Sequence, residues 1–255
     1  LEIGLVATEY IESGATTGLA GLLEDSPRFD YSGGASCPSL LLEPSRTNLA
    51  KYSEALNITP NVVDSATYSY NQIASPSGFI NAPKFAETTA NDRHGFYQYV
   101  TIADGAVTAS IFTKQIDRRY VHFNSNATGG GVSSYIDLQD GSVVSEGTGW
   151  TLSTEDYGNG WWRISASATG VAGSRYFIWG MSLNGTSNTY VGNGSEFTFW
   201  GFQVEQGSYP TSYIPNHSGG SVTRNAESYS KTFTTGLTTN AGTMYFEVDL
   251  PQGRE

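Results

Sequence analysis

Period-two alternation of apolar and polar residues recurs in several short segments of this chain. Its apolar phase in the clearest segments consists of Phe96, Val100 and Ile102; Val107, Ala109 and Ile111; Val121 and Phe123; and Trp162, Ile164, Ala166 and Ala168. Such alternation is typical of antiparallel strands with one buried face and one face toward water. Two sheets of this kind pack face to face, so we predict an all-β antiparallel β-sandwich of the jelly-roll type.

Pairs of Asp or Asn with Gly separate the alternating segments, beginning at Asp104, Asp140, Asn159, Asn184 and Asn193. Each pair tolerates the positive φ that a tight hairpin requires. Composition supports the same fold class, because charged residues make up only 15% and aromatic residues 13% of the chain. A helical bundle would need more Ala, Leu, Glu and Lys, and a disordered chain would have fewer aromatic residues.

The chain is acidic, with a net charge of −11 over 255 residues. Such a surface repels phosphate backbones and anionic lipid, so we expect no nucleic-acid partner and no membrane insertion. No apolar run is long enough to cross a bilayer. The single cysteine, Cys37, excludes an internal disulfide. Because a start methionine and a signal peptide are both missing, we expect a processed product or an excised piece.

Residues 1–13 resemble residues 204–216 without a gap. The identical pairs are Glu2 and Glu205, Gly4 and Gly207, Thr8 and Thr211, Tyr10 and Tyr213, and Ile11 and Ile214. We interpret the first segment as the end of a preceding repeat, since tandem repeats are normally modules of a longer chain. The alternative is a chance similarity between two turns.

These features predict four parts. Residues 1–13 end a preceding repeat, and residues 14–46 form a connector with a short hairpin. Residues 47–216 form the jelly roll, and residues 217–255 contain a linker and the first strand of a following module. Alternatively, that last strand, at residues 243–250, adds to a sheet of this domain or of a neighbouring subunit.

Several phrases resemble a known group of proteins. PRFDY at residues 27–31, followed by CPSLLLEPSRTNL at residues 37–49, resembles a connector of bacteriophage tail and other virion proteins. GNGWWRISASATG at residues 158–170 and FWGFQVEQGSYPTSYIP at residues 199–215 resemble phrases of the carbohydrate-binding-module-like jelly rolls that follow that connector. The resemblance implies a β-sandwich in a multidomain phage structural or host-recognition protein, built from repeated modules.

The same resemblance implies the partners. They are a cell-surface polysaccharide or glycan, other virion protein subunits, and further copies of the chain in a homo-oligomer such as a trimer, on the virion surface. GTMYFEVDLP at residues 242–251 is similar to the opening of a lectin-like sandwich. Two alternatives stay open, because a fold does not determine a ligand. One is a purely architectural spacer or decoration domain, and the other is an accessory carbohydrate-binding module of a secreted polysaccharide-degrading enzyme.

Sugar binding needs exposed aromatic rings with hydrogen-bonding groups beside them, and clustered exposed rings usually mark interaction sites. The polar phases of the strands predict a carbohydrate-binding face made of Tyr97, Tyr120, His122, Asn124, Trp161 and Arg163, with Tyr99 and Phe112 also exposed. Alternatively, these rings lie under a connector or against another module, and Trp161 with Arg163 forms a structural cation–π pair. The tryptophans predicted to lie in or near the core are Trp150, Trp162, Trp179 and Trp200.

Catalytic and metal chemistry find little support in the sequence. A structural Ca²⁺ is the one cofactor considered, with Glu205 and Asp137 or Asp140 as oxygen ligands. The three histidines show no zinc-binding spacing. No GxSxG or other pairing of a nucleophile with a base occurs, so we predict that the chain is not an enzyme.

Overall fold

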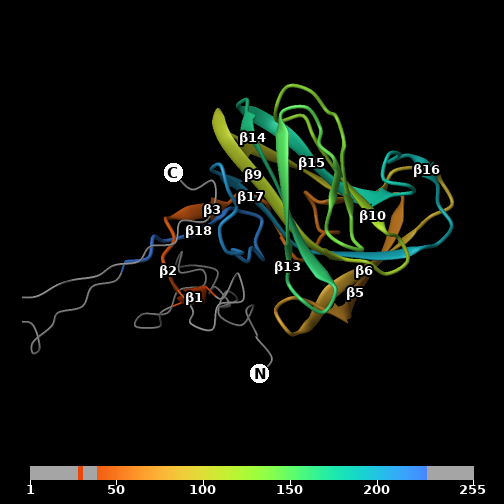
Figure 1. Ribbon diagram of the computed structural model, residues 1–255, viewed down its shortest axis with the longest axis horizontal. Coiled ribbons are helices and arrows are strands. Elements are labelled where there is room, and N and C mark those ends of the chain that lie inside the picture. Colours follow the sequence, from red (N-terminus) through yellow and green to blue (C-terminus); the bar gives the residue numbers. More distant parts are fainter. Residues whose placement is uncertain (1–27, 31–38, 229–255) are drawn as a thin grey trace, which may run out of the picture.

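The computed structural model describes residues 28–30 and 39–228, which form two large antiparallel sheets packed face to face (Figure 1). The first sheet contains β4 (Val62–Asp64), β8 (His94–Ile102), β10 (Tyr120–Ser125), β11 (Ser134–Asp137), β12 (Val143–Ser145) and β15 (Gly173–Ser182). The second sheet contains β5 (Ala66–Ala74), β6 (Ile80–Glu87), β9 (Gly105–Lys114), β13 (Trp150–Asp156), β14 (Trp161–Gly170) and β17 (Glu196–Gln206).

Shorter ladders flank the two sheets. They pair β1 (Arg28–Asp30) with β2 (Ser39–Leu41), β3 (Arg46–Asn48) with β18 (Val222–Arg224), and β7 (Asn91–Asp92) with β16 (Tyr190–Val191). Within the described part of the chain, no helix is long and apolar enough to cross a membrane. The predictions for residues 1–13, for Cys37 and for the strand at residues 243–250 lie outside the described residues.

The strand order is that of a jelly roll, which confirms the predicted fold class. Along the chain, β8, β9 and β10 alternate between the two sheets, and so do β14, β15 and β17. As a result, the strand row β8-β15-β10-β11 of the first sheet packs over the row β6-β17-β9-β14 of the second sheet. The turn at Asn159 and Gly160 closes a hairpin between β13 and β14, as predicted. The turn at Asp104 and Gly105 also has positive φ at the glycine, but it leads from one sheet to the other because β8 and β9 belong to different sheets.

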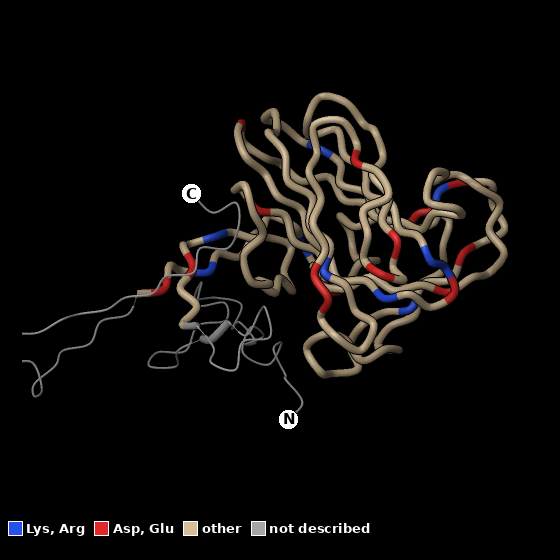
Figure 2. Tube along the Cα trace, in the orientation of Figure 1, with Lys and Arg blue, Asp and Glu red and all other residues tan. Residues whose placement is uncertain are grey.

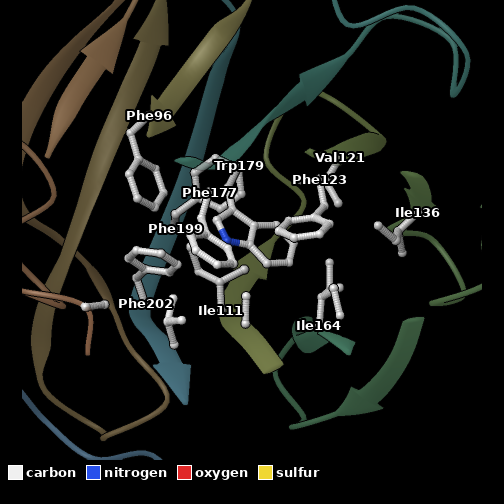
Figure 3. Close-up of a cluster of buried hydrophobic side chains, with 14 of the residues drawn as sticks. Phe96, Ile111, Val121, Phe123, Ile136, Ile164, Phe177, Trp179, Phe199 and Phe202 are labelled. Carbon is white, nitrogen blue, oxygen red and sulfur yellow. The ribbon is translucent and has the colours of Figure 1, made fainter. Parts of the chain in front are cut away.

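The core lies between the sheets and includes most residues of the predicted apolar phases (Figure 3). Fully buried members on facing strands include Phe96, Ile111, Val121, Phe123, Ile164, Phe177 and Trp179. Trp150 is buried in this cluster and Trp162 packs partly buried against it, so both lie where the sequence predicts them. Burial of this apolar area is the main stabilising contribution to such a domain.

Trp200 is also buried, but on the opposite side of the second sheet from Phe199 and Phe202. The pairing of β17 with β9 shifts register between Trp200 and Gln203, and Gly201 has a φ of +67°. A bulge with glycine in the left-handed region inserts one residue and reverses the alternation of the strand. Trp200 is therefore buried, as predicted, but simple alternation, which would place it on the face of Phe202, fails at this bulge.

A second, smaller apolar cluster covers the outer face of the second sheet. Its buried members are Ala82, Phe112, Trp161, Trp200 and Tyr213. The cluster forms because the closing segment, residues 207–216, leaves β17 and folds back over this sheet. The ring of Tyr213 lies 4.9 Å from the ring of Trp200 and 6.0 Å from that of Phe112, measured between centroids.

Buried polar contacts join the predicted connector, residues 14–46, to the part of the chain that follows β17. The Glu43 carboxylate lies 2.8 Å from the Arg224 guanidinium and accepts a hydrogen bond of 2.9 Å from the Ser212 amide. We call Glu43, Ser212 and Arg224 the clasp. The Glu227 amide donates to the carbonyl of Glu43, so the chain enters and leaves the sandwich at one place, beside β3 and β18 (Figure 1).

Candidate functional site

The structure divides the predicted carbohydrate-binding residues between the two outer faces of the sandwich. Those on the first sheet are Tyr97, Tyr120, His122 and Asn124, and those on the second sheet are Trp161 and Arg163. Strand alternation explains the outward direction, since their neighbours Phe96, Phe123 and Ile164 fill the core. The predicted set therefore does not form one face, because the two sheets point in opposite directions.

The predicted site residues of the second sheet are buried. Phe112 and Trp161 belong to the second cluster, and the Arg163 guanidinium lies 5.4 Å from the centroid of the Phe112 ring. Arg163 also donates a hydrogen bond of 2.5 Å to the carbonyl of Thr211 in the closing segment. The expectation that these three residues face water is wrong. The closing segment contacts Phe112 and Arg163, and the Trp161 indole N–H donates to the Ala74 carbonyl at the end of β5 at 3.0 Å. The cation–π partner of Arg163 is Phe112 rather than Trp161.

Two predicted residues of the first sheet are buried as well. His122 is fully buried, its Nδ1 lies 3.1 Å from the Met181 carbonyl, and burial lowers its pKa to about 4. Gly180 makes room for the ring, since a Cβ there would lie 2.5 Å from His122 Cε1. The Asn124 amide donates to Ser133 Oγ at 2.9 Å, within the loop that follows β10. The expectation of exposure is wrong for both residues.

Tyr120 is half-buried at the start of β10. The Arg119 guanidinium lies 5.2 Å from the centroid of its ring. The turn at Gly185 also approaches the ring, since a Cβ there would lie 3.1 Å from Tyr120 Cδ1. Tyr120 is therefore partly enclosed by protein.

Tyr97 lies on an exposed part of the first sheet, beside Tyr99 and Tyr176. Tyr99 is 56% exposed, and the other two rings are half-buried. The Tyr99 ring lies 6.1 Å from that of Tyr97 and 6.2 Å from that of Tyr176, edge to face in both cases. We call these residues the tyrosine cluster. Sequence reasoning missed Tyr176, although its alternation with Phe177 in RYFIWG places it on the outward phase.

The surroundings of the tyrosine cluster combine apolar and hydrogen-bonding groups. Val62 of β4 pairs directly opposite Tyr97 and is exposed, and Thr101 is the next outward residue of β8. The loop after β10 lies against Tyr176, since a Cβ on Gly131 would overlap the tyrosine hydroxyl. Phenol rings can cover an apolar ligand face while hydroxyl groups donate and accept hydrogen bonds.

The carboxylates considered as calcium ligands contact protein groups. Glu205 is fully buried, burial raises its pKa, and its oxygens accept hydrogen bonds from the amide and hydroxyl of Thr211. Asp137 pairs with Arg119, which holds the pKa of that carboxyl below its usual value, and Asp140 accepts from a backbone amide. Among the described residues, no group of three or more His, Cys, Asp or Glu is placed to hold a metal ion. Structural calcium stays a prediction.

The strand order and this surface define a jelly-roll β-sandwich with an exposed aromatic cluster. No protein-family profile matches the chain, and no curated protein matches its sequence. One similar solved structure is the CBM22-1 xylan-binding domain of Paenibacillus barcinonensis Xyn10C, with 11% identity, 65% of this chain and 94% of that chain covered, and a TM-score of 0.35.

Two further structures show similar likenesses. The CBM22-1-GH10 modules of Clostridium thermocellum endo-1,4-β-D-xylanase 10B, complexed with xylohexaose, match at 12% identity, with 68% of this chain and 30% of that chain covered and a TM-score of 0.35. The module CBM6cm-2 of Cellvibrio mixtus lichenase 5A, in complex with cellotriose, matches at 10% identity, with coverages of 66% and 99% and a TM-score of 0.28. At such low TM-scores no ligand follows for this chain.

Proposed function

We propose that this chain is a non-catalytic module that binds glycans through the tyrosine cluster. The observation that carries the proposal is the contact of three tyrosine rings at an exposed place on the first sheet. Exposed aromatic groups that cluster in this way mark interaction sites. Tyrosine suits such a site because it supplies a large, rigid contact area and a hydrogen-bonding hydroxyl.

A glycan matches the chemistry of this surface. A saccharide ring has an apolar C–H face, which the exposed ring of Tyr99 can cover, and a rim of hydroxyl groups. The phenol hydroxyls and the nearby Thr101 hydroxyl can donate and accept hydrogen bonds to that rim. The net charge of −11 repels anionic polymers, so the proposed ligand is an uncharged polysaccharide or glycan.

Tyr99→Ala is expected to weaken glycan binding at least about tenfold, which corresponds to about 1.4 kcal/mol. The free energy of unfolding should change little, because substitutions of exposed residues usually stay within about 0.5 kcal/mol. The measurement is binding of the full chain to a microbial glycan array, followed by calorimetric titration with the best-bound glycan.

Tyr70→Ala is the matched control, because Tyr70 is 54% exposed but lies on β5 of the second sheet. Equal binding by all three proteins would move the site away from the tyrosine cluster. No binding by the wild-type chain would contradict the glycan-binding function itself. Trp161→Ala is unsuitable here, since the buried indole holds the second cluster together and its loss would disturb the fold.

We further propose that the module belongs to a bacteriophage tail, fibre or other virion protein and contacts host glycans from the virion surface. The support is the likeness of the connector and closing phrases to such proteins. Assembly with other virion subunits, or into a homo-oligomer such as a trimer, would strengthen weak single-site binding through avidity. A secreted polysaccharide-degrading enzyme is the alternative parent, and a catalytic domain encoded in the same gene would identify it.

One observation favours the purely architectural alternative. Phe79 and Ile80, at the turn between β5 and β6, are both exposed to more than half of their surface. Apolar side chains placed together at a hairpin tip can pack on a neighbouring protein. A wild-type chain that stays silent on the glycan array would favour this function.

We propose that residues 1–13 close a preceding module, because the residues that they share with residues 204–216 hold the closing segment in place. The five shared positions of the second copy are Glu205, Gly207, Thr211, Tyr213 and Ile214. Four of them are fully or nearly fully buried, and Gly207 has a φ of +152°. These side chains hold the closing segment against the second sheet, so the identities fall on structurally demanding positions.

Deleting residues 1–27 is therefore expected to leave the melting temperature of the domain unchanged. The first copy would serve another module, so the described sandwich would lose no contact that it needs. Thermal unfolding followed by tryptophan fluorescence measures this. A clear fall in melting temperature would mean that the first copy packs on this sandwich.

A further inference from the structure

We propose a second ligand site on the outer face of the second sheet, in a cavity of about 540 Å³ that accepts an uncharged saccharide. This volume lies within the range of about 300–1,000 Å³ of small-ligand pockets. The cavity lies on the opposite side of the sandwich from the tyrosine cluster, and its geometry does not depend on that cluster. The inference shares the ligand class of the proposed function and adds a site to it.

Hydroxyl side chains of β13 and β14 line the cavity. Thr151 and Ser153 point outward because their neighbours Trp150 and Leu152 belong to the core. Thr151 pairs directly opposite Ser167, so their hydroxyl groups stand side by side on the sheet. Two neighbouring strands thus present a flat array of small polar groups.

Hydrogen bonds orient part of this array. The Thr108 hydroxyl donates to the Gly207 carbonyl at 2.9 Å and lies 2.8 Å from Ser167 Oγ. Because its one proton goes to the carbonyl, Thr108 accepts from Ser167. Ser167 therefore keeps an acceptor lone pair for a ligand. The hydroxyl groups of Ser153 and Ser165 lie 2.7 Å apart and form a second such pair.

The closing segment forms the wall of the cavity through Ser208, Tyr209 and Pro210. The Arg46 guanidinium lies 5.2 Å from the centroid of the Tyr209 ring, in cation–π contact. The Gly207 amide donates to the Ala106 carbonyl at 2.9 Å, which fixes the start of the segment on β9. The aromatic wall is held in place by protein contacts, and such preorganisation reduces the entropy lost on binding.

The lining selects the chemical class of the ligand. None of the lining residues is charged, and Thr151, Ser153, Ser167 and Tyr209 supply hydroxyl groups. Figure 2 shows charged positions on strands and in loops alike, and none of these positions belongs to the lining. A phosphate or carboxylate would find no counter-charge in the lining, and a wholly apolar ligand would leave the remaining acceptor lone pair of Ser167 unused. A saccharide satisfies both the hydroxyl groups and the aromatic wall.

The two sites would allow one module to hold two glycan chains, or two parts of one chain. The test is a ¹⁵N–¹H NMR titration of the full chain with maltohexaose, cellohexaose and xylohexaose, each at millimolar concentration. We expect at least one of these sugars to shift the amide signals of Thr151, Ser153 and Ser167. Tyr209→Ala should lower the affinity measured at these amides at least about tenfold.

Tyr99→Ala separates this site from the proposed function, because it should abolish shifts around the tyrosine cluster and leave those at the cavity. Thr151→Val is the second cavity variant, used in case Tyr209→Ala disturbs the fold. It removes one hydroxyl group at nearly constant shape and should weaken binding severalfold, whereas Thr101→Val on the first sheet should leave cavity binding unchanged.

If none of the three sugars shifts the cavity amides, the proposal of a second site is wrong, whether or not the tyrosine cluster binds a glycan. Cavity shifts that survive both Tyr209→Ala and Thr151→Val would also overturn it.

Discussion

Glu43→Ala is expected to lower the free energy of unfolding by about 3–5 kcal/mol. The carboxylate of Glu43 and the guanidinium of Arg224 lie 2.8 Å apart, with side chains only 1% and 2% exposed. Removing the carboxylate would take from the buried Arg224 guanidinium the carboxylate that lies 2.8 Å away, and breaking a buried ion pair is among the most costly single changes in a folded protein. The Ser212 amide would also lose its acceptor.

Urea unfolding followed by tryptophan fluorescence measures this effect. Lys84→Ala is the matched control, because the Lys84–Glu196 pair has the same separation of 2.8 Å but side chains 33% and 39% exposed. Breaking that exposed pair should cost less than about 1 kcal/mol. The double variant Glu43→Leu/Arg224→Met should be more stable than Glu43→Ala, since it replaces both buried charges by apolar side chains. Equal effects of Glu43→Ala and Lys84→Ala would show that the clasp does not stabilise the fold.

Acidification from about pH 7 to pH 4 is expected to remove up to about 3 kcal/mol of stability through His122. Burial lowers the pKa of this fully buried ring from 6.5 to about 4. The unfolded chain therefore binds a proton between these pH values that the folded chain does not bind. The stability contribution is complete above pH 6.5 and is lost as the pH falls toward 4, at about 1.4 kcal/mol for each pKa unit.

The test compares the free energy of unfolding of the wild-type chain and His122→Gln at about pH 7, 5.5 and 4. The variant loses the contact with the Met181 carbonyl at every pH, so only the difference in pH dependence reports the titration of the ring. Carboxylates held at low pKa, such as those of Glu87 and Asp137, contribute to both proteins alike. Parallel stability curves for the two proteins would refute the prediction.

The inward faces of the strands could be predicted because they follow from neighbours along the chain. Phe96, Ile111, Phe123 and Ile164 alternate with polar residues, and a strand places successive side chains on opposite faces wherever it lies. Trp200 marks the limit of this rule. The bulge at Gly201 reverses the alternation, and the sequence alone shows only a glycine where the backbone adopts a positive φ.

The candidate site was harder to predict, because alternation does not assign strands to sheets. Tyr97 and Trp161 both occupy outward phases, yet they lie on opposite sides of the domain. Tyr176 belongs beside Tyr99 only because β15 pairs with β8, although these strands are separated in the chain by several others. Pairing between distant strands is a property of the whole fold.

The sequence by itself determined that the chain forms antiparallel strands, which side chains fill the core, and where glycine turns occur. These features depend on periodicity and on backbone conformations that neighbouring residues specify. Only the tertiary structure decided which outward faces meet water. Arg163 is buried because Thr211, 48 residues further along the chain, folds back over it, whereas Tyr99, also on an outward phase, is 56% exposed. The exposure of an outward side chain therefore depends on where distant segments pack, and local pattern carries no information about that.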